Sequence, residues 1–139
     1  MSEAIISIKN LRKHFPVKNI WGTDIALVKA LDGVDLKIES GKTFGIVGES
    51  GCGKTTLMRT LLRLVEPTSG SVVLSKEITG GQFSSNNLED LTGHELRRFR
   101  RQIGVVFQDP MGALNPRMLI KDIVSEPLVI HGKTDNTRE

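Results

Sequence analysis

The sequence lacks most of the features that would place a chain in a special class. Its 139 residues include one cysteine, Cys52, so no disulfide can form within the chain. No apolar run is long enough to span a membrane, and no signal-peptide pattern follows Met1. No internal repeat and no clear linker is present. These absences favour a single soluble domain located in the cytosol.

A strong charge of one sign is also missing. Lys and Arg together number 19 against 16 for Asp and Glu, which gives a formal net charge of +3. So small an excess does not indicate a nucleic-acid partner. The densest basic stretch, residues 97–101, fits the solvated face of a helix better than a contact to a phosphate backbone. We therefore expect no nucleic acid among the partners.

What the sequence does contain is a glycine-rich loop between a strand-like and a helix-like segment. Residues 48–55 read Gly-Glu-Ser-Gly-Cys-Gly-Lys-Thr and fit the pattern G-x-x-x-x-G-K-[ST]. The apolar run 43–47 before the loop predicts a buried strand. Apolar residues at helical spacing after it predict a helix that stops before Pro67. Strand, loop and helix in this order are the context that a phosphate-binding loop requires.

The residue types of this loop suit a polyphosphate. Backbone N–H groups of a turn and of a helix N-terminus can point at crowded negative charge, and glycine lets the backbone approach closely. Lys54 is expected to reach the β- and γ-phosphates, and Thr55 to place its hydroxyl on Mg²⁺. The alternative is a glycine-rich turn that opens an ordinary helix. The predicted phosphate-binding residues are Gly48, Glu49, Ser50, Gly51, Cys52, Gly53, Lys54 and Thr55.

The remaining pattern predicts an α/β domain in which a parallel core sheet, flanked by helices, lies beside a smaller antiparallel sheet. Short apolar or alternating runs predict outer strands at 5–8, 34–38 and 71–74, and a second buried strand at 103–107. Polar stretches predict loops at 17–27 and 76–91. A capping box at 92–95 predicts a helix start, and a further short helix is expected from Ile120, ended or kinked near Pro127.

Three separated stretches resemble the ATP-binding subunits of ABC transporters, most closely those of the oligopeptide and dipeptide permease group. The phosphate loop alone indicates only a P-loop NTPase. The third stretch, which includes Val-Val-Phe-Gln-Asp-Pro and Leu-Asn-Pro-Arg-Met, narrows the resemblance to the transporter group. The resemblance covers nearly the whole chain, and its stretches are residues 28–36 with 45–57, 64–72, and 105–110 with 114–118 and 126–128.

The resemblance implies roles for further residues. Phe15 matches the aromatic that stacks on adenine, Thr56 extends the phosphate loop, and Gln108 matches the Q-loop glutamine that contacts Mg²⁺ and the attacking water. By this likeness Lys54 and Gln108 are the catalytic residues, Thr55 and Gln108 hold the metal, and ATP and Mg²⁺ are the cofactors. Phe15 also fits a core or turn aromatic, and Gln108 a polar end to a buried strand.

The resemblance also implies partners and limits. The expected partners are ATP, transmembrane permease subunits, a second ATP-binding subunit, identical or different, and indirectly an extracytoplasmic solute-binding protein. The expected location is the cytoplasm, on the inner face of the plasma membrane.

Residues 1–139 resemble the N-terminal half of such a domain, with a nucleotide-binding core to about 110 and the start of a helical subdomain at about 111–139. Nothing after Gln108 matches the family's signature loop, its Mg²⁺-holding Asp with adjacent catalytic Glu, or its switch His. We therefore expect ATP binding without useful turnover by the truncated chain, and hydrolysis by the complete subunit.

Alternatives remain open at this point. Asp109, at the end of the 103–107 run, could hold Mg²⁺ in a small phosphotransferase, or the loop could serve a nucleotide switch. Residues 79–82, Thr-Gly-Gly-Gln, look like a signature loop, but they precede Gln108 and fit an ordinary surface loop. A DNA-repair or translation ABC protein would share the loops without favouring the Leu-Asn-Pro-Arg-Met continuation.

Overall fold

The computed structural model describes residues 4–81, 83–109, 112 and 114–132. Two compact units divide the chain, Met1–Ile103 and Gly104–Glu139, and each is considered by itself. Within the described part of the chain, no helix has the length and apolar character needed to cross a membrane.

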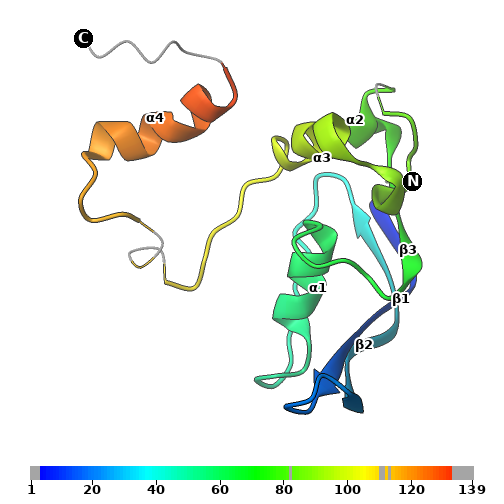
Figure 1. Cartoon of the computed structure of the whole chain (residues 1–139). Coiled ribbons are helices and arrows are strands. Elements are labelled where there is room, and N and C mark those ends of the chain that lie inside the picture. Colours follow the sequence, from blue (N-terminus) through cyan, green and yellow to red (C-terminus); the bar gives the residue numbers. More distant parts are fainter. Residues whose placement is uncertain (1–3, 82, 110–111, 113, 133–139) are drawn as a thin grey trace. The chain divides into compact units, whose positions relative to one another are not determined.

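The first unit is built on a three-stranded antiparallel sheet in the order β2-β1-β3 (Figure 1). The strands are β1 (Ala4–Lys18), β2 (Asp24–Glu39) and β3 (Ser69–Leu74). The central strand β1 pairs with β2 along a long hairpin and with β3 on its other side. Strands therefore form at all three places where alternating or short apolar runs predicted outer strands.

The β1–β2 hairpin is longer than the sequence suggested. Residues 17–27 were expected to form a loop, but the connection occupies only 19–23. The side chain of Asn19 closes it, because its Oδ1 accepts the backbone N–H of Trp21 at 3.0 Å and that of Thr23 at 2.9 Å. An asparagine that binds the backbone two residues on is a standard turn former. The strands therefore continue to the edge of this tight turn.

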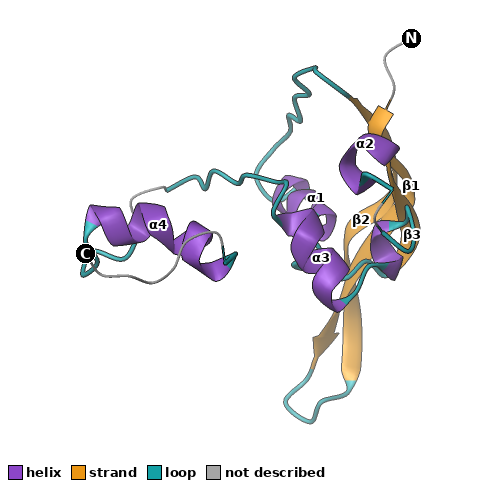
Figure 2. Ribbon diagram, turned by 90° about the horizontal axis from the view of Figure 1, so that it is seen from above, coloured by secondary structure: helices purple, strands orange, loops and turns teal. Residues whose placement is uncertain are grey.

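Two helices, α1 (Lys54–Leu61) and α3 (Gly93–Arg100), lie against the same face of this sheet (Figure 2). Leu57 faces the sheet from α1 and Phe99 from α3, and both are buried. The helix start that the capping box at 92–95 predicted is confirmed, because α3 begins at Gly93. The buried core cluster consists of Ile8, Leu11, Leu31, Leu57, Val72, Leu74, Leu88, Leu91 and Phe99.

The basic stretch on α3 does more than face solvent. The guanidinium of Arg100 donates from Nε to the Leu62 carbonyl at 3.0 Å and from Nη2 to the Arg63 carbonyl at 2.6 Å. These carbonyls follow the last turn of α1, where helical carbonyls lack partners within the helix. Arg100 therefore caps α1 from the neighbouring helix, a role that the reading of 97–101 as a solvated face missed.

Residues 76–91 were expected to be a polar surface loop, and this prediction is wrong in part. The segment contains a short helix, α2 (Lys76–Thr79), and a 3₁₀ turn, η1 (Leu88–Asp90). Leu88 and the following Leu91 are buried in the core, which outweighs the polar composition around them. Thr79 ends α2 rather than opening a signature-like loop, and Gln82 lies outside the described residues.

Neither of the two predicted buried strands, 43–47 and 103–107, is formed. Both segments are irregular, and apart from Ile103, which packs partly buried against the core, their apolar side chains are exposed: Val47 keeps 94% of its surface accessible and Val106 88%. A strand needs a neighbour to take up its backbone N–H and C=O groups. Among the described residues the only sheet is the antiparallel one, so neither segment has such a neighbour. An apolar run is therefore not enough to form a strand at either place.

The second unit contains one helix among its described residues, α4 (Ile120–Ile130). It begins where expected, at Ile120. It continues three residues past Pro127, with the His131 N–H donating to the Pro127 carbonyl at 3.1 Å. None of its residues is buried, and Ile120 and Val124 are largely exposed.

The difference in burial between Leu11 and Val47 predicts different changes in the free energy of unfolding when each is substituted. Leu11 is fully buried, so Leu11→Ala should lower the free energy of unfolding by about 2–5 kcal/mol. Val47→Ser should change it by less than about 0.5 kcal/mol, because Val47 is exposed. Urea unfolding of the two variants beside the wild type measures both. A large loss in Val47→Ser would show that 43–47 is a buried strand after all.

Candidate functional site

The glycine-rich loop leads directly into α1. The helix begins at Lys54, and Gly53 occupies the position before it with φ 99°, a left-handed conformation that glycine adopts readily. The helical pattern starts at once, since the Leu57 N–H donates to the Gly53 carbonyl at 2.8 Å. No acidic residue lies in the first turn of α1. The N–H groups and dipole of this helix end therefore act on the loop without a carboxylate in the same helical turn to offset them.

The Lys54 side chain folds back into the loop. Its Nζ donates to the Gly48 carbonyl at 2.7 Å and to the Glu49 carbonyl at 2.5 Å, and lies 3.4 Å from Cys52 Sγ. One ammonium thus joins the start of the loop to the start of the helix. A cation held at this point by backbone oxygens is placed to exchange those oxygens for the oxygens of a phosphate.

Two glycines of the loop are required by close contacts. A Cβ at Gly53 would overlap the Ala30 carbonyl oxygen and lie 3.4 Å from Leu31 Cδ2. A Cβ at Gly48 would lie 2.8 Å from Cys52 Sγ. The first contact seats the loop on strand β2, and the second keeps the loop closed on itself. The end of the loop is therefore positioned by the sheet through direct backbone packing.

Phe15 lies on β1, opposite Val28 of β2, with 38% of its surface exposed. The Lys13 ammonium sits 4.8 Å from the centre of its ring, within the range of a cation–π contact. Phe15 is not part of the buried core cluster, which weakens its reading as a core aromatic. Its assignment as a platform for a base stays a prediction.

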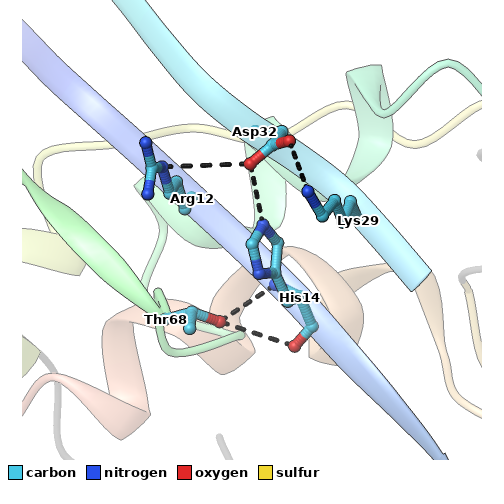
Figure 3. A network of polar contacts seen from close by, with 5 residues as sticks. All are labelled: Arg12, His14, Lys29, Asp32 and Thr68. Carbon is cyan, nitrogen blue, oxygen red and sulfur yellow. Dashed lines mark hydrogen bonds and ion pairs between the residues drawn. The ribbon is translucent and has the colours of Figure 1, made fainter. Parts of the chain in front are cut away.

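A network of polar contacts surrounds the residue before Phe15 (Figure 3). His14 Nε2 lies 3.0 Å from Asp32 Oδ1, and Lys29 Nζ donates to Asp32 Oδ2 at 3.2 Å. Arg12 Nε is 3.9 Å from the same carboxylate. The Thr68 hydroxyl accepts the His14 backbone N–H at 2.9 Å. Hydrogen bonds from Lys29 and then from His14 lower the pKa of Asp32 below its ordinary value of 3.8.

The predicted metal-holding residues differ in their placement. Thr55 is exposed at the second position of α1, beside Lys54, and Thr56 follows it half-buried. Gln108 is exposed and belongs to the second unit, so its assignment remains a prediction. Among the described residues, no group of three or more His, Cys, Asp or Glu side chains could hold a metal by itself. Any Mg²⁺ at Thr55 would therefore depend on ligand oxygens as well.

Asp109, the alternative metal ligand, has a local partner. Its Oδ1 accepts the Gly112 N–H at 3.0 Å, and a Cβ at Gly112 would overlap its other oxygen. The carboxylate thus closes a turn in its own segment, as Asp side chains commonly do. It does not follow a formed strand, which a phosphotransferase of the predicted kind would need.

Sequence reasoning missed Ala30, whose carbonyl packs against Gly53 of the loop, and Asp32, which joins side chains of β1 and β2. Ala30 contributes a backbone carbonyl, which any residue could supply, so no side-chain signal marked it. Asp32 stands in a plain alternation of apolar and polar residues on β2. Its contact with His14 depends on the register between β1 and β2, and the sequence of one strand alone does not determine that register.

Known proteins match this loop and the sequence around it. A family model described as ABC transporter matches residues 31–138. The chain belongs to the ABC transporter family. Among its relatives, a probable peptide ABC transporter ATP-binding protein of Sinorhizobium fredii, y4tS, is 40% identical over 129 residues, which are 92% of this chain and 34% of that protein. The oligopeptide transport ATP-binding protein OppF of Bacillus subtilis is 39% identical over 139 residues, all of this chain and 41% of OppF.

Solved structures of ABC cassettes are similar as well. The dimeric bacterial ABC transporter cassette MJ0796 matches with a TM-score of 0.69 at 29% identity, over 96% of this chain and 50% of that chain. Its post-hydrolysis state bound to ADP and Pi gives 0.70 at 28% identity, with the same coverage. These likenesses confirm the predicted P-loop NTPase fold class. This ABC family member spans about two-fifths or less of the two curated relatives' length and half that of the solved cassette.

Gly53 offers a test of how the loop is seated. Gly53→Ala should weaken binding of Mg-ATP and also lower stability, because the added methyl overlaps the Ala30 carbonyl and φ 99° is strained for alanine. Gly41→Ala is a matched control, since it shares a positive φ, has open space around a Cβ and lies outside the predicted phosphate-binding residues. Isothermal titration and thermal unfolding measure both effects. Equal losses in the two variants would argue that backbone strain alone, and not contact with β2, matters.

The pKa of Asp32 can be tested through its first partner. Lys29→Ala should raise the pKa of Asp32 toward 3.8, as followed by carboxyl carbon NMR, while Lys18→Ala on the same hairpin should leave it unchanged. Because folding lowers this pKa, Asp32 stabilises the folded chain above pH 3.8, and that contribution disappears as pH falls through the folded-state pKa. If the pKa of Asp32 is the same in Lys29→Ala as in the wild type, the hydrogen bond between Lys29 and Asp32 is contradicted.

Proposed function

We propose that this chain binds ATP with Mg²⁺ at the phosphate loop, as the nucleotide-binding part of an ABC importer for peptides or similar solutes. The observation that carries the proposal is the Lys54 ammonium, held by two loop carbonyls at the start of α1. Family membership supports it, and the names of the relatives indicate peptide transport. The solved cassette bound to ADP and Pi supports a nucleotide as the ligand.

The described residues fit a polyphosphate. The start of α1 offers N–H groups and a positive dipole end, and Lys54 adds a full positive charge beside it. A Cβ at Gly48 would fill the inside of the loop, so glycine there keeps room for close approach. A bound phosphate would take Lys54 away from the Gly48 and Glu49 carbonyls, and the new bonds would be stronger because they join the ammonium to a negatively charged oxygen instead of a neutral one.

The donor set also fits Mg²⁺ that arrives with the nucleotide. Protein sites for Mg²⁺ commonly supply one or two ligands and leave the rest to phosphate oxygens and water. We assign one of these ligands to the Thr55 hydroxyl, and the metal would neutralise phosphate charge there. Gln108 is proposed as a further ligand on its likeness to the Q-loop glutamine alone. The base is assigned to Phe15, whose ring is partly exposed on β1.

In a complete subunit we propose that the bound ATP is hydrolysed to energise transport. Phosphoryl transfer depends on several positioned groups acting together. Lys54 and Gln108 are two of them, while the given sequence holds no match to a signature loop, a catalytic Glu or a switch His. The chain by itself is therefore proposed to bind ATP without useful turnover. The proposed partners are permease subunits, a second ATP-binding subunit and, indirectly, a solute-binding protein, at the inner face of the plasma membrane.

Titration of Mg-ATP into the wild type and Lys54→Ala tests the proposal. Loss of a charged hydrogen-bonding group is worth about 1.5–3 kcal/mol, so the variant should bind about ten- to over a hundredfold more weakly. Lys37→Ala, which removes an exposed lysine from β2, should bind as the wild type does. Neither protein should release phosphate from ATP above background. Equal binding by Lys54→Ala would refute the site, and hydrolysis lost in Lys54→Ala would refute the proposed inactivity.

A further inference from the structure

The pairing of β1 with β2 contains an irregularity next to the phosphate loop. Lys13 pairs with Leu31, but the next residue, His14, pairs with Lys29. Ala30 is therefore an extra residue on β2, which is the arrangement of a β-bulge. A bulge interrupts the ladder, bends the strand and changes the direction of the side chains that follow.

This bulge is the place where the phosphate loop meets the sheet. The Ala30 carbonyl packs against Gly53 so closely that a Cβ there would overlap it. On the other strand, Phe15 is the second residue after the interruption and pairs with Val28. The bulge thus lies between the seat of the phosphate loop and the aromatic assigned to the base. Its geometry sets the spacing between the two ends of a bound nucleotide.

Asp32 links both sides of this bulge. Its two oxygens contact Lys29 of β2 and His14 of β1, the two residues that pair immediately beyond Ala30 (Figure 3). The Thr68 hydroxyl fixes the His14 backbone from the third side, through contacts to its N–H and its carbonyl. Asp32 itself is exposed, and exposed ion pairs add little to the stability of a fold. The stability that these contacts give to the domain is therefore small, and it does not explain why Asp32 contacts both strands.

We propose that Asp32 is a positioning residue for nucleotide binding. By joining His14 and Lys29 across the Ala30 bulge, it holds the strand that carries Phe15 at a fixed place relative to the loop seated on Ala30. The inference rests on the proposed function, with Phe15 as the base platform. Asp32 makes no contact with the nucleotide in this scheme, and it acts through Phe15.

The test compares the binding of a ligand that contains a base with the binding of a ligand that has none. Mg-ATP and inorganic tripolyphosphate with Mg²⁺ are titrated into the wild type and Asp32→Ala. The variant should bind ATP at least about fivefold more weakly, since base–aromatic stacking is worth that much, and should bind tripolyphosphate unchanged. Asp35→Ala is the matched control, because Asp35 is a second exposed aspartate on β2 that contacts the β1 backbone at Asn10, away from the bulge.

Further variants separate positioning from a general structural role. Phe15→Ala should lose the same part of ATP affinity, and adding Asp32→Ala to it should cost nothing more, because both act on one contact. Asp32→Glu should recover part of the ATP affinity. If Asp32→Ala does not fold, as judged by circular dichroism, His14→Ala removes the same link from the other strand and should show the same split between the two ligands.

The outcomes are distinct. Equal weakening of both ligands in Asp32→Ala, unchanged ATP binding, or losses that add to those of Phe15→Ala would each overturn the positioning role. In those cases the proposed function stands as long as Lys54→Ala weakens ATP binding at least about tenfold in the otherwise unchanged chain. A wild type that binds neither ligand would instead overturn the proposed function, and the role of Asp32 with it.

Discussion

The site depends on one close contact between backbones, that of Gly53 with the Ala30 carbonyl. Because there is no side chain at Gly53, the loop reaches the sheet and α1 starts at a fixed height above it. The helix is then held from both ends. Leu57 enters the core that Leu11 and Leu31 share, and Arg100 binds the carbonyls that follow the last turn. The C-terminal end of the glycine-rich loop is positioned because the helix that follows it is held at both of its ends.

Lys54 and Asp32 show two ways in which charge serves this arrangement. Lys54 lies inside the loop and uses backbone oxygens as partners, so its charge stays close to where phosphates are proposed to bind. Asp32 lies on the surface and links β1 to β2, where solvent weakens the attraction between opposite charges. The contribution that we propose for Asp32 is one of geometry, because its carboxylate contacts side chains of both strands.

The sequence predicted the features that a single segment determines. The glycine-rich turn before a helix, that helix and the outer strands each have a local pattern, and each formed at its expected place, although β1 and β2 are longer than predicted. The predictions that were wrong involve partners elsewhere in the chain. The 43–47 run has the composition of a buried strand but finds no neighbouring strand among the described residues. Leu88 and Leu91 lie in a polar stretch, and only the assembled core shows why they are buried. The Ala30 bulge is likewise a property of two strands together.

The internal hydrogen bonds of Lys54 also bear on how a ligand is taken up. Its ammonium already has the Gly48 and Glu49 carbonyls as acceptors, so a phosphate gains only the difference between the new bonds and the old ones. In return, the loop keeps its curvature through a cation of its own and has little disorder to lose on binding. If phosphates bind here as proposed, discrimination among anions would follow from charge density, because a polyphosphate would compete with the two carbonyls for the ammonium better than a weakly charged anion would.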